Sequence, residues 1–173
     1  TKYTDDLQVP DMLHGVMVRV PVNHAEITSI DYSALDERKD IVICDYRDIP
    51  AQKKVGPIKQ DQPIFSWEKI VTPGDVVAML VGENKEQLYH LARQVKVSFN
   101  ELPVLTDPLK ALDAEAPRIH PQFDDNFIVH YPLRKGNVEQ GFAESDGIIE
   151  ETYTTQNIEH AYIEPESVVA IPL

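Results

Sequence analysis

The chain has 173 residues, of which 42% are apolar and 26% are charged, a composition typical of a globular protein. Its 29 acidic and 16 basic residues give a formal net charge of −13, which argues against nucleic acid as a partner because phosphate binding needs a cationic surface. No apolar run approaches the ~20 residues of a membrane span, so we expect no membrane insertion. Cys44 is the single cysteine, which excludes an intramolecular disulfide. We expect it in the core and interpret the lack of disulfides as favouring a cytoplasmic location.

The first part of the chain predicts several short strands. Alternating valines predict a strand over 13–20, and residues 25–30 predict the return strand of an antiparallel hairpin. A helical turn over 33–38 leads to a short buried strand over 41–44. Residues 47–65 contain several prolines and show no period, which predicts a loop.

The middle of the chain predicts a strand, a helix and a second strand. Residues 76–81 are a continuous apolar run, typical of a strand that is covered on both faces. Residues 84–94 have apolar positions at helical spacing and predict an amphipathic helix. Residues 95–99 alternate between apolar and polar, which predicts a half-buried strand. If the two strands are parallel, the helix closes a right-handed crossover.

The character of the sequence changes after Pro103. We expect a short helix over 107–112, a polar loop over 113–126, strands over 127–131 and 147–156, and a helical turn over 137–144. The pattern therefore predicts an α/β or α+β fold, of which we expect α+β: a mixed sheet with at least one crossover helix over residues 1–112, then a connector and first strands over 113–173. We interpret the missing initial Met and the apolar final residues 167–173 as marks of a piece cut from a larger protein.

Catalytic motifs are mostly missing from the sequence: there is no glycine-rich phosphate loop, no Gly-x-Ser-x-Gly and no zinc motif. Ionisable groups are concentrated only in residues 156–166, where Glu159, His160, Glu164 and Glu166 lie in an otherwise apolar stretch. Histidine and carboxylates together can bind a metal or exchange protons. The alternative interpretation is a turn held by hydrogen bonds between glutamate and the backbone.

Three blocks, in order, resemble the large subunit of molybdenum hydroxylases of the xanthine dehydrogenase/aldehyde oxidase family. The first, over 11–31, contains Leu13-His14-Gly15 and ends on Ile30-Asp31. The second, over 70–103, ends on a Val-x-Val-x-Phe strand and Leu102-Pro103. The third comprises residues 136–146 and the run Glu159-His160-Ala161-Tyr162-Ile163-Glu164-Pro165. Together the blocks cover nearly the whole chain.

This resemblance implies an α/β-hammerhead domain over 1–112, followed by a connector and the truncated start of a molybdenum-binding domain over 113–173. It implies a parent enzyme that hydroxylates purines or related N-heterocycles with oxygen from water, with aldehydes or nicotinate-like acids as alternative substrates. It also implies molybdopterin in the parent, and iron–sulfur clusters and FAD on partner domains or subunits. The expected partners are those domains, the remainder of the subunit and a small-molecule substrate.

The resemblance places the general base of the family beyond Leu173, so we expect no catalytic residue here, no bound cofactor and no activity in the isolated chain. The residues expected nearest the molybdopterin are Gln156, His160 and Glu164. Xanthine dehydrogenases of the family commonly carry Gln where this chain has Ile158. In a strand, Gln156 would share its face and could partly substitute.

A competing hypothesis from another class is a self-contained, non-enzymatic acidic interaction domain that uses a sheet edge as its docking surface. It predicts a final strand, residues 168–173, that is paired within the chain. The fragment hypothesis predicts instead that this strand lacks a partner.

Overall fold

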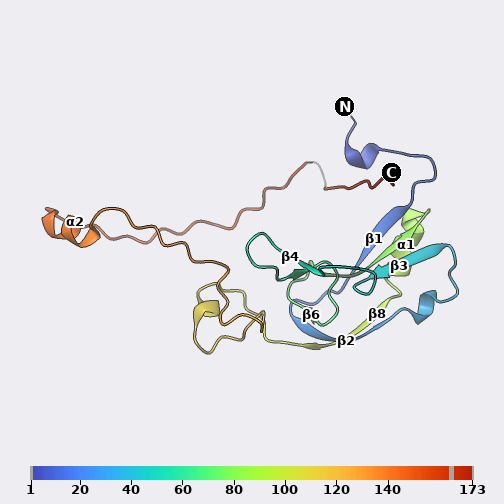
Figure 1. Ribbon diagram of the computed structural model, residues 1–173, viewed down its shortest axis with the longest axis horizontal. Helices are drawn as coiled ribbons and strands as arrows, with labels where there is room; N and C mark the ends of the chain where they lie inside the picture. Colours follow the sequence, from blue (N-terminus) through green and yellow to red (C-terminus); the bar gives the residue numbers. More distant parts are fainter. Residues whose placement is uncertain (1, 164–165, 173) are drawn as a thin grey trace. The chain divides into compact units, whose positions relative to one another are not determined.

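The computed structural model describes residues 2–163 and 166–172, which form two units. The main body comprises residues 10–130 and contains all the sheets found among the described residues (Figure 1). The second unit comprises residues 1–9 and 131–173. No helix among the described residues is long and apolar enough to cross a membrane.

One sheet of the main body has strand β7 (Val76–Gly82) at its centre, between β1 (His14–Arg19) and β3 (Ile41–Asp45). Both pairs are antiparallel. The apolar run of β7 suits a strand whose two faces are both largely covered: Val77 on one face and Ala78 and Leu80 on the other are buried. Leu80 lies opposite Val16 on one side and Ile43 on the other, and it is fully buried.

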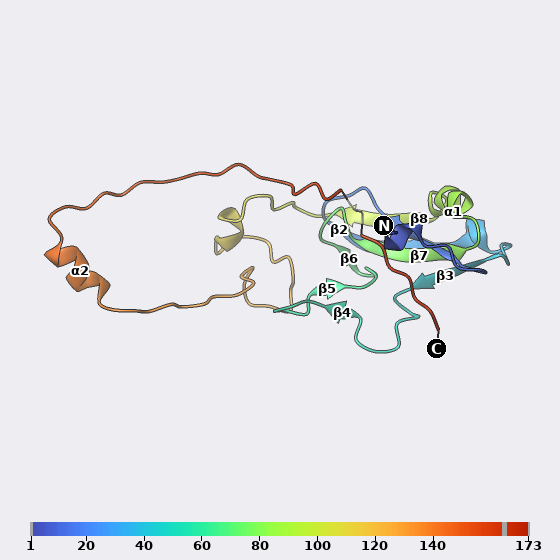
Figure 2. The same cartoon turned by 90° about the horizontal axis from the view of Figure 1, so that it is seen from above.

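The other three-stranded sheet has β2 (Ala25–Asp31) between β6 (Lys69–Ile70) and β8 (Lys96–Glu101), again with antiparallel pairs only (Figure 2). The predicted hairpin of 13–20 with 25–30 is therefore wrong, because β1 and β2 belong to different sheets. The backbone turns sharply between them, where the N–H of Val22 donates to the carbonyl of Val20 at 2.8 Å. Pro21 has no N–H to continue a ladder, which explains why the pairing stops there.

Helix α1 (Lys85–Ala92) is confirmed, and it begins with Asn84, whose Oδ1 accepts a hydrogen bond from the N–H of Gln87 at 3.0 Å. Its buried face, Leu88 and Leu91, packs against β1 and β7. The helix joins β7 of one sheet to β8 of the other. The two strands are therefore not parallel neighbours in one sheet, and the right-handed crossover that parallel strands would have given does not occur. The α+β class is confirmed, but the expected single mixed sheet is divided into antiparallel sheets.

Small elements complete the main body. Strands β4 (Lys54–Val55) and β5 (Gln62–Pro63) pair in the segment predicted as a loop. Single 3-10 turns, η2 (Ser33–Leu35) and η3 (Lys110–Leu112), lie where short helices were predicted.

The core lies between the sheets and α1, and its buried residues come from positions 16–91. Cys44 does not belong to it: it is half-buried on the outer strand β3, which corrects the sequence expectation. Burial, helped by the charges of Asp48 and Asp45, raises the pKa of its thiol.

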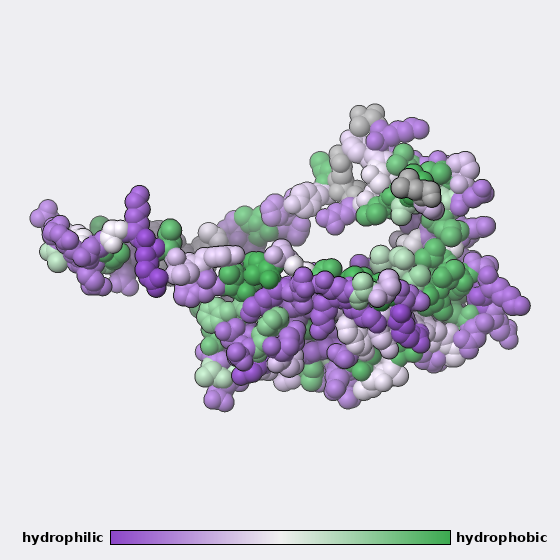
Figure 3. Space-filling model, viewed as in Figure 1, coloured by the Kyte–Doolittle hydropathy of each residue, from purple (hydrophilic) through white to green (hydrophobic). Residues whose placement is uncertain are grey.

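The second unit contains the 3-10 turn η1 (Thr4–Asp6) and helix α2 (Val138–Glu144), which confirms the helical turn predicted over 137–144. The expected strands over 147–156 and 127–131 are both wrong, because neither segment has a partner strand among the described residues. Apolar side chains stay at the surface of the second unit instead (Figure 3): Leu133, Ile149, Tyr153 and Val168 are each about nine-tenths exposed or more.

Candidate functional site

The predicted cofactor contacts lie in the second unit, in a stretch without helix or strand. Gln156 and His160 are both exposed, and Glu164 lies outside the described residues. Among the described residues, neither the Gln156 amide nor the His160 imidazole takes part in a hydrogen bond of the side chain. No side-chain hydrogen bond therefore joins Gln156 to His160 among the described residues, and the predicted contacts stay a prediction.

A local turn shapes the segment around His160. The Oε1 atom of Glu159 accepts a hydrogen bond from the N–H of Ala161 at 3.2 Å, and Ala161 has a φ of 49°. The ring of His160 stacks on that of Tyr162, with the centroids 5.7 Å apart. The interpretation of a turn held by glutamate and the backbone is confirmed for Glu159, and the described residues contain no group of three or more His, Cys, Asp or Glu that could hold a metal ion.

Polar side chains converge elsewhere, around a cavity of about 580 Å³ inside the main body. Strands β2, β4 and β6 contribute Glu26, Lys54 and Lys69, and the loop after η3 contributes His120. Its complete lining is Glu26, Lys54, Asp61, Pro63, Trp67, Glu68, Lys69, Val71, Leu102, Ile119, His120, Pro121 and Gln122.

The loop that carries His120 is fixed by side-chain hydrogen bonds to its backbone. Asn126 donates from Nδ2 to the carbonyls of Ala111 (2.9 Å) and Pro117 (3.2 Å), and its Oδ1 accepts from the N–H of Ile119 (3.0 Å). Lys69 then joins this loop to strand β6 by donating from Nζ to the carbonyl of Ile119 at 2.7 Å. The Asn126 side chain therefore fixes the shape of the loop, and the Lys69 ammonium group attaches this loop to β6, so that the loop forms one wall of the cavity.

The charges at this cavity are partly desolvated. Burial lowers the pKa of Lys69, against the opposing charge of Glu26. Burial also lowers the pKa of His120; the Asp61 carboxylate opposes this, and the charges of Lys69 and Lys54 add to it. The Nε2 atom of His120 lies 3.8 Å from Oδ2 of Asp61. The cavity can therefore offer hydrogen-bond donors to a ligand, and its lining carries both ammonium groups (Lys54, Lys69) and carboxylates (Glu26, Asp61, Glu68).

Sequence reasoning missed this cavity. Its chemistry-bearing residues come from positions 26, 54, 61, 67, 69 and 120, which share no spacing or motif. The prolines and the lack of a period predicted a loop over 47–65. The pairing of β4 with β5 and of β2 with β6 positions the residues of these strands that line the cavity together with residues 119–122.

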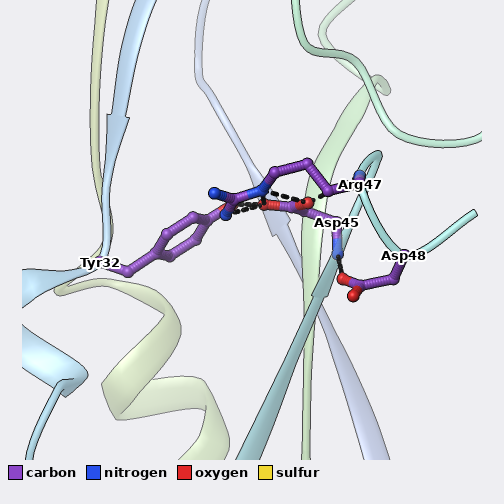
Figure 4. A network of polar contacts seen from close by, with 4 residues as sticks. All are labelled: Tyr32, Asp45, Arg47 and Asp48. Carbon is purple, nitrogen blue, oxygen red and sulfur yellow. Dashed lines mark hydrogen bonds and ion pairs between the residues drawn. The ribbon is translucent and has the colours of Figure 1, made fainter.

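A second polar cluster surrounds the buried Asp45 at the end of β3 (Figure 4). Arg47 pairs with its carboxylate, donating from Nη2 at 2.6 Å and from Nε at 3.0 Å, and the Tyr32 hydroxyl donates to it at 3.1 Å. The N–H of Asp45 donates to the Asp48 carboxylate at 2.8 Å. Burial raises the pKa of Asp45, but the hydrogen bonds and charge of Arg47 outweigh it, so that the pKa is lowered. This cluster holds the β3 end in place and offers no open site.

Two family models match the chain in succession. The model described as aldehyde oxidase and xanthine dehydrogenase, a/b hammerhead domain, matches residues 1–103. The model described as molybdopterin cofactor-binding domain matches residues 119–173. The first alone covers more than half of the chain.

Curated relatives align along almost the whole chain. A probable xanthine dehydrogenase subunit from Bacillus subtilis (strain 168) is 33% identical over 173 residues, which cover 99% of this chain and 23% of that protein. A nicotinate dehydrogenase large molybdopterin subunit from Eubacterium barkeri is 29% identical over 172 residues, covering 98% of this chain and 40% of that protein. The chain spans less than half the length of either relative.

The fold has solved counterparts as well. An aldehyde oxidoreductase from Desulfovibrio gigas matches with a TM-score of 0.63 and 27% identity over 69% of this chain and 15% of that chain. This likeness, with the hammerhead match, confirms the hammerhead fold expected for the first part of the sequence.

Proposed function

This chain belongs to the aldehyde oxidase and xanthine dehydrogenase family, and we propose that it is the opening part of a larger molybdopterin-dependent hydroxylase. The observation that carries the proposal is the order of the two family matches, a hammerhead domain and then, after a short unmatched segment, a molybdopterin cofactor-binding domain. We assign residues 1–112 to the first and residues 113–173 to the connector and start of the second. The unmatched residues 104–118 span this boundary.

The proposed substrate of the parent enzyme is a purine or a related N-heterocycle. It is supported by the Bacillus subtilis relative, whose name describes a probable xanthine dehydrogenase and which is 33% identical. A nicotinate-like acid or an aldehyde is the alternative, because one relative is named for nicotinate and one structural counterpart for aldehydes. We expect the isolated chain to turn over none of these, because the family resemblance implies that the general base lies elsewhere in the parent enzyme.

The proposed cofactor is molybdopterin, which would supply the oxidising metal for adding oxygen from water to an activated carbon. The residues that the structure describes do not form a site for it: Gln156 and His160 are exposed and not gathered around any cradle. We propose that Gln156, His160 and Glu164 come nearest the cofactor when the remainder of the subunit folds over this segment. Their amide, imidazole and carboxylate groups can all form hydrogen bonds.

The proposed partners are the remainder of the molybdenum-binding subunit and the domains or subunits that carry iron–sulfur clusters and FAD. The relatives support this, since the names of two of them describe subunits. We also propose a cytoplasmic location, which is supported by a single cysteine and hence no intramolecular disulfide.

In the parent enzyme, Gln156→Ala and His160→Ala are each expected to lower turnover about tenfold, because groups that orient a metal cofactor typically matter by 10- to 100-fold. Stability should change little, since both side chains are exposed and lack hydrogen-bonded partners among the described residues. The measurement is turnover together with molybdenum content per chain. The control is His130→Ala, another exposed histidine. Equal turnover in all three variants would contradict the proposal that Gln156 and His160 contact the cofactor.

The substrate class is tested on the native protein, captured from its source with an antibody against this chain. Incubation with an electron-accepting dye and xanthine, nicotinate or an aromatic aldehyde in ¹⁸O-labelled water should give labelled product in which oxygen from water has been added, with the two electrons passing to the dye, most rapidly from xanthine. A faster reaction with nicotinate or aldehyde would select the alternative substrate. No labelled product from any of the three would contradict the proposed activity.

A further inference from the structure

The segment of residues 111–127, which we call the strap, lies on the main body without joining its sheets. Among the described residues, no backbone hydrogen bond links the strap to residues 10–103. The strap also adds no side chain to the hydrophobic core, whose buried and packed members lie between positions 16 and 99. Segments that share neither a ladder nor a core with the rest of a protein open before the rest unfolds.

The strap is closed on itself by its own hydrogen bonds. Asn126, near one end, donates from Nδ2 to the carbonyl of Ala111 at the other end, at 2.9 Å. Between these residues, the N–H of Phe123 donates to the carbonyl of His120 at 3.0 Å. A surface loop whose ends are joined in this way is held in shape by its own groups. The strap can therefore move as one unit.

Lys59, which lies between β4 and β5, attaches one end of the strap to the rest of the main body. Its Nζ donates to the carbonyl of Phe127, and it lies 3.7 Å from Oδ1 of Asp125 and 4.5 Å from the centre of the Phe123 ring. The Asp125 side chain is more than half exposed, so solvent screens this ion pair. The attachment is specific in its geometry but open to water.

Two further contacts hold the middle of the strap. Lys69 donates from Nζ to the carbonyl of Ile119 at 2.7 Å, and Nε2 of His120 lies 3.8 Å from Oδ2 of Asp61. Asp61, Ile119 and His120 line both the cavity of about 580 Å³ and a second cavity of about 410 Å³. The strap therefore lies between two cavities, and each described polar contact that holds it there comes from a side chain at position 59, 61 or 69.

We propose that the strap is a lid that swings away from the sheets as one unit, and that its movement joins the two cavities into a single opening. Each cavity lies within the ~300–1,000 Å³ of small-molecule sites, so the joined opening has room for a small ligand. The inference does not rest on the proposed hydroxylase activity, and it is tested without molybdenum.

The test uses Lys59→Gln in the full 173-residue chain, because this change removes one attachment and leaves the hydrogen bonds within the strap intact. Lys69 is the reporter, since its amine must leave the Ile119 carbonyl before it reacts with an acylating reagent. Peptide mass spectrometry gives the labelling rate. We expect Lys69 to be labelled about tenfold faster in the variant, the effect of losing one hydrogen bond from a charged donor. Lys85, exposed at the start of α1, should be labelled at an unchanged rate.

Hydrogen exchange at single amides tests whether the strap moves as one unit. The N–H of Ile119 donates to Oδ1 of Asn126 inside the strap, so its exchange should stay as slow in Lys59→Gln as in the unaltered chain. The N–H of Leu88 in α1 should also be unchanged, which shows that the sheets and helix remain folded.

Two variants control for the change of charge. Lys39→Gln removes the same charge from another exposed lysine and should leave the labelling of Lys69 unaltered, and Lys59→Arg should keep it slow. The proposal is overturned if Lys69 is labelled equally fast in Lys59→Gln and Lys39→Gln. Faster exchange at Ile119 in Lys59→Gln would overturn it as well, because the strap would then unravel rather than swing, and faster exchange at Leu88 would show general unfolding in place of a lid.

Discussion

Asp45→Ala is expected to lower the free energy of unfolding by about 3 kcal/mol, because a buried carboxylate that satisfies several donors is lost at once. The carboxylate accepts hydrogen bonds from the Tyr32 hydroxyl and from the side chain and backbone N–H of Arg47. The Tyr32 hydroxyl, which is partly buried, would lose this acceptor. Chemical denaturation of the full chain, followed by Trp67 fluorescence, measures the effect.

Asp40→Ala is the matched control. Asp40 also pairs with an arginine two residues away, Arg38, at the same 2.6 Å as Arg47 and Asp45. Its side chain is more than half exposed, however, so solvent screens the pair and its loss should be barely measurable. Equal destabilisation by both variants would show that burial is not what makes the Asp45 cluster stabilising.

The contribution of Asp45 should also depend on pH. Because its pKa is lower in the folded protein than in the unfolded chain, its charged form adds stability above the unfolded value of about 3.9, and this is lost as the pH falls through the folded value. The difference in stability between the unaltered chain and Asp45→Asn should therefore shrink below about pH 4. A difference that stays constant down to about pH 2 would contradict the charge-based explanation.

Leu80→Ala is expected to have an effect of similar size, about 3 kcal/mol, because it leaves a cavity at the centre of the core. Leu80 has no exposed surface and lies on β7 between Val16 and Ile43 of the neighbouring strands. Both neighbours belong to regular ladders, which limits how far the backbone can close the gap. Denaturant unfolding again gives the value.

Leu109→Ala removes the same atoms from a side chain that is 75% exposed, and it should change stability by less than about 0.5 kcal/mol. A small effect at Leu80 would mean that β7 is not the centre of the core. A large effect at both positions would show that the truncation itself, rather than burial, is responsible.

The elements of the main body were predictable from the sequence wherever a face is buried. The apolar run of β7 and the spacing of Leu88 and Leu91 in α1 each reflect packing within the described residues. Strand pairing was not predictable in the same way. The valines of β1 face the core whether the partner is β2 or β7, so the pattern alone could not show that the hairpin is absent.

Residues 147–156 show that strand-like composition alone does not produce a strand. Their β-branched residues fit a strand, but a strand needs a neighbour to satisfy its backbone, and none is present among the described residues. Gln156 and His160 likewise lie in a segment with no neighbouring strand among the described residues, so the contacts proposed for them rest on the family resemblance alone. The cavity of Lys54, Lys69 and His120 could not be predicted at all, because three separate strands and a loop bring its residues together.

The proposed parent enzyme is tested most directly by the mass of the native protein that contains this chain, recorded together with its molybdenum content. We expect a subunit several times longer than 173 residues that carries about one molybdenum atom, the stoichiometry of a single molybdopterin site. A metal-free native chain of 173 residues would contradict the hydroxylase, and it would leave the acidic interaction domain as the better explanation of the same fold.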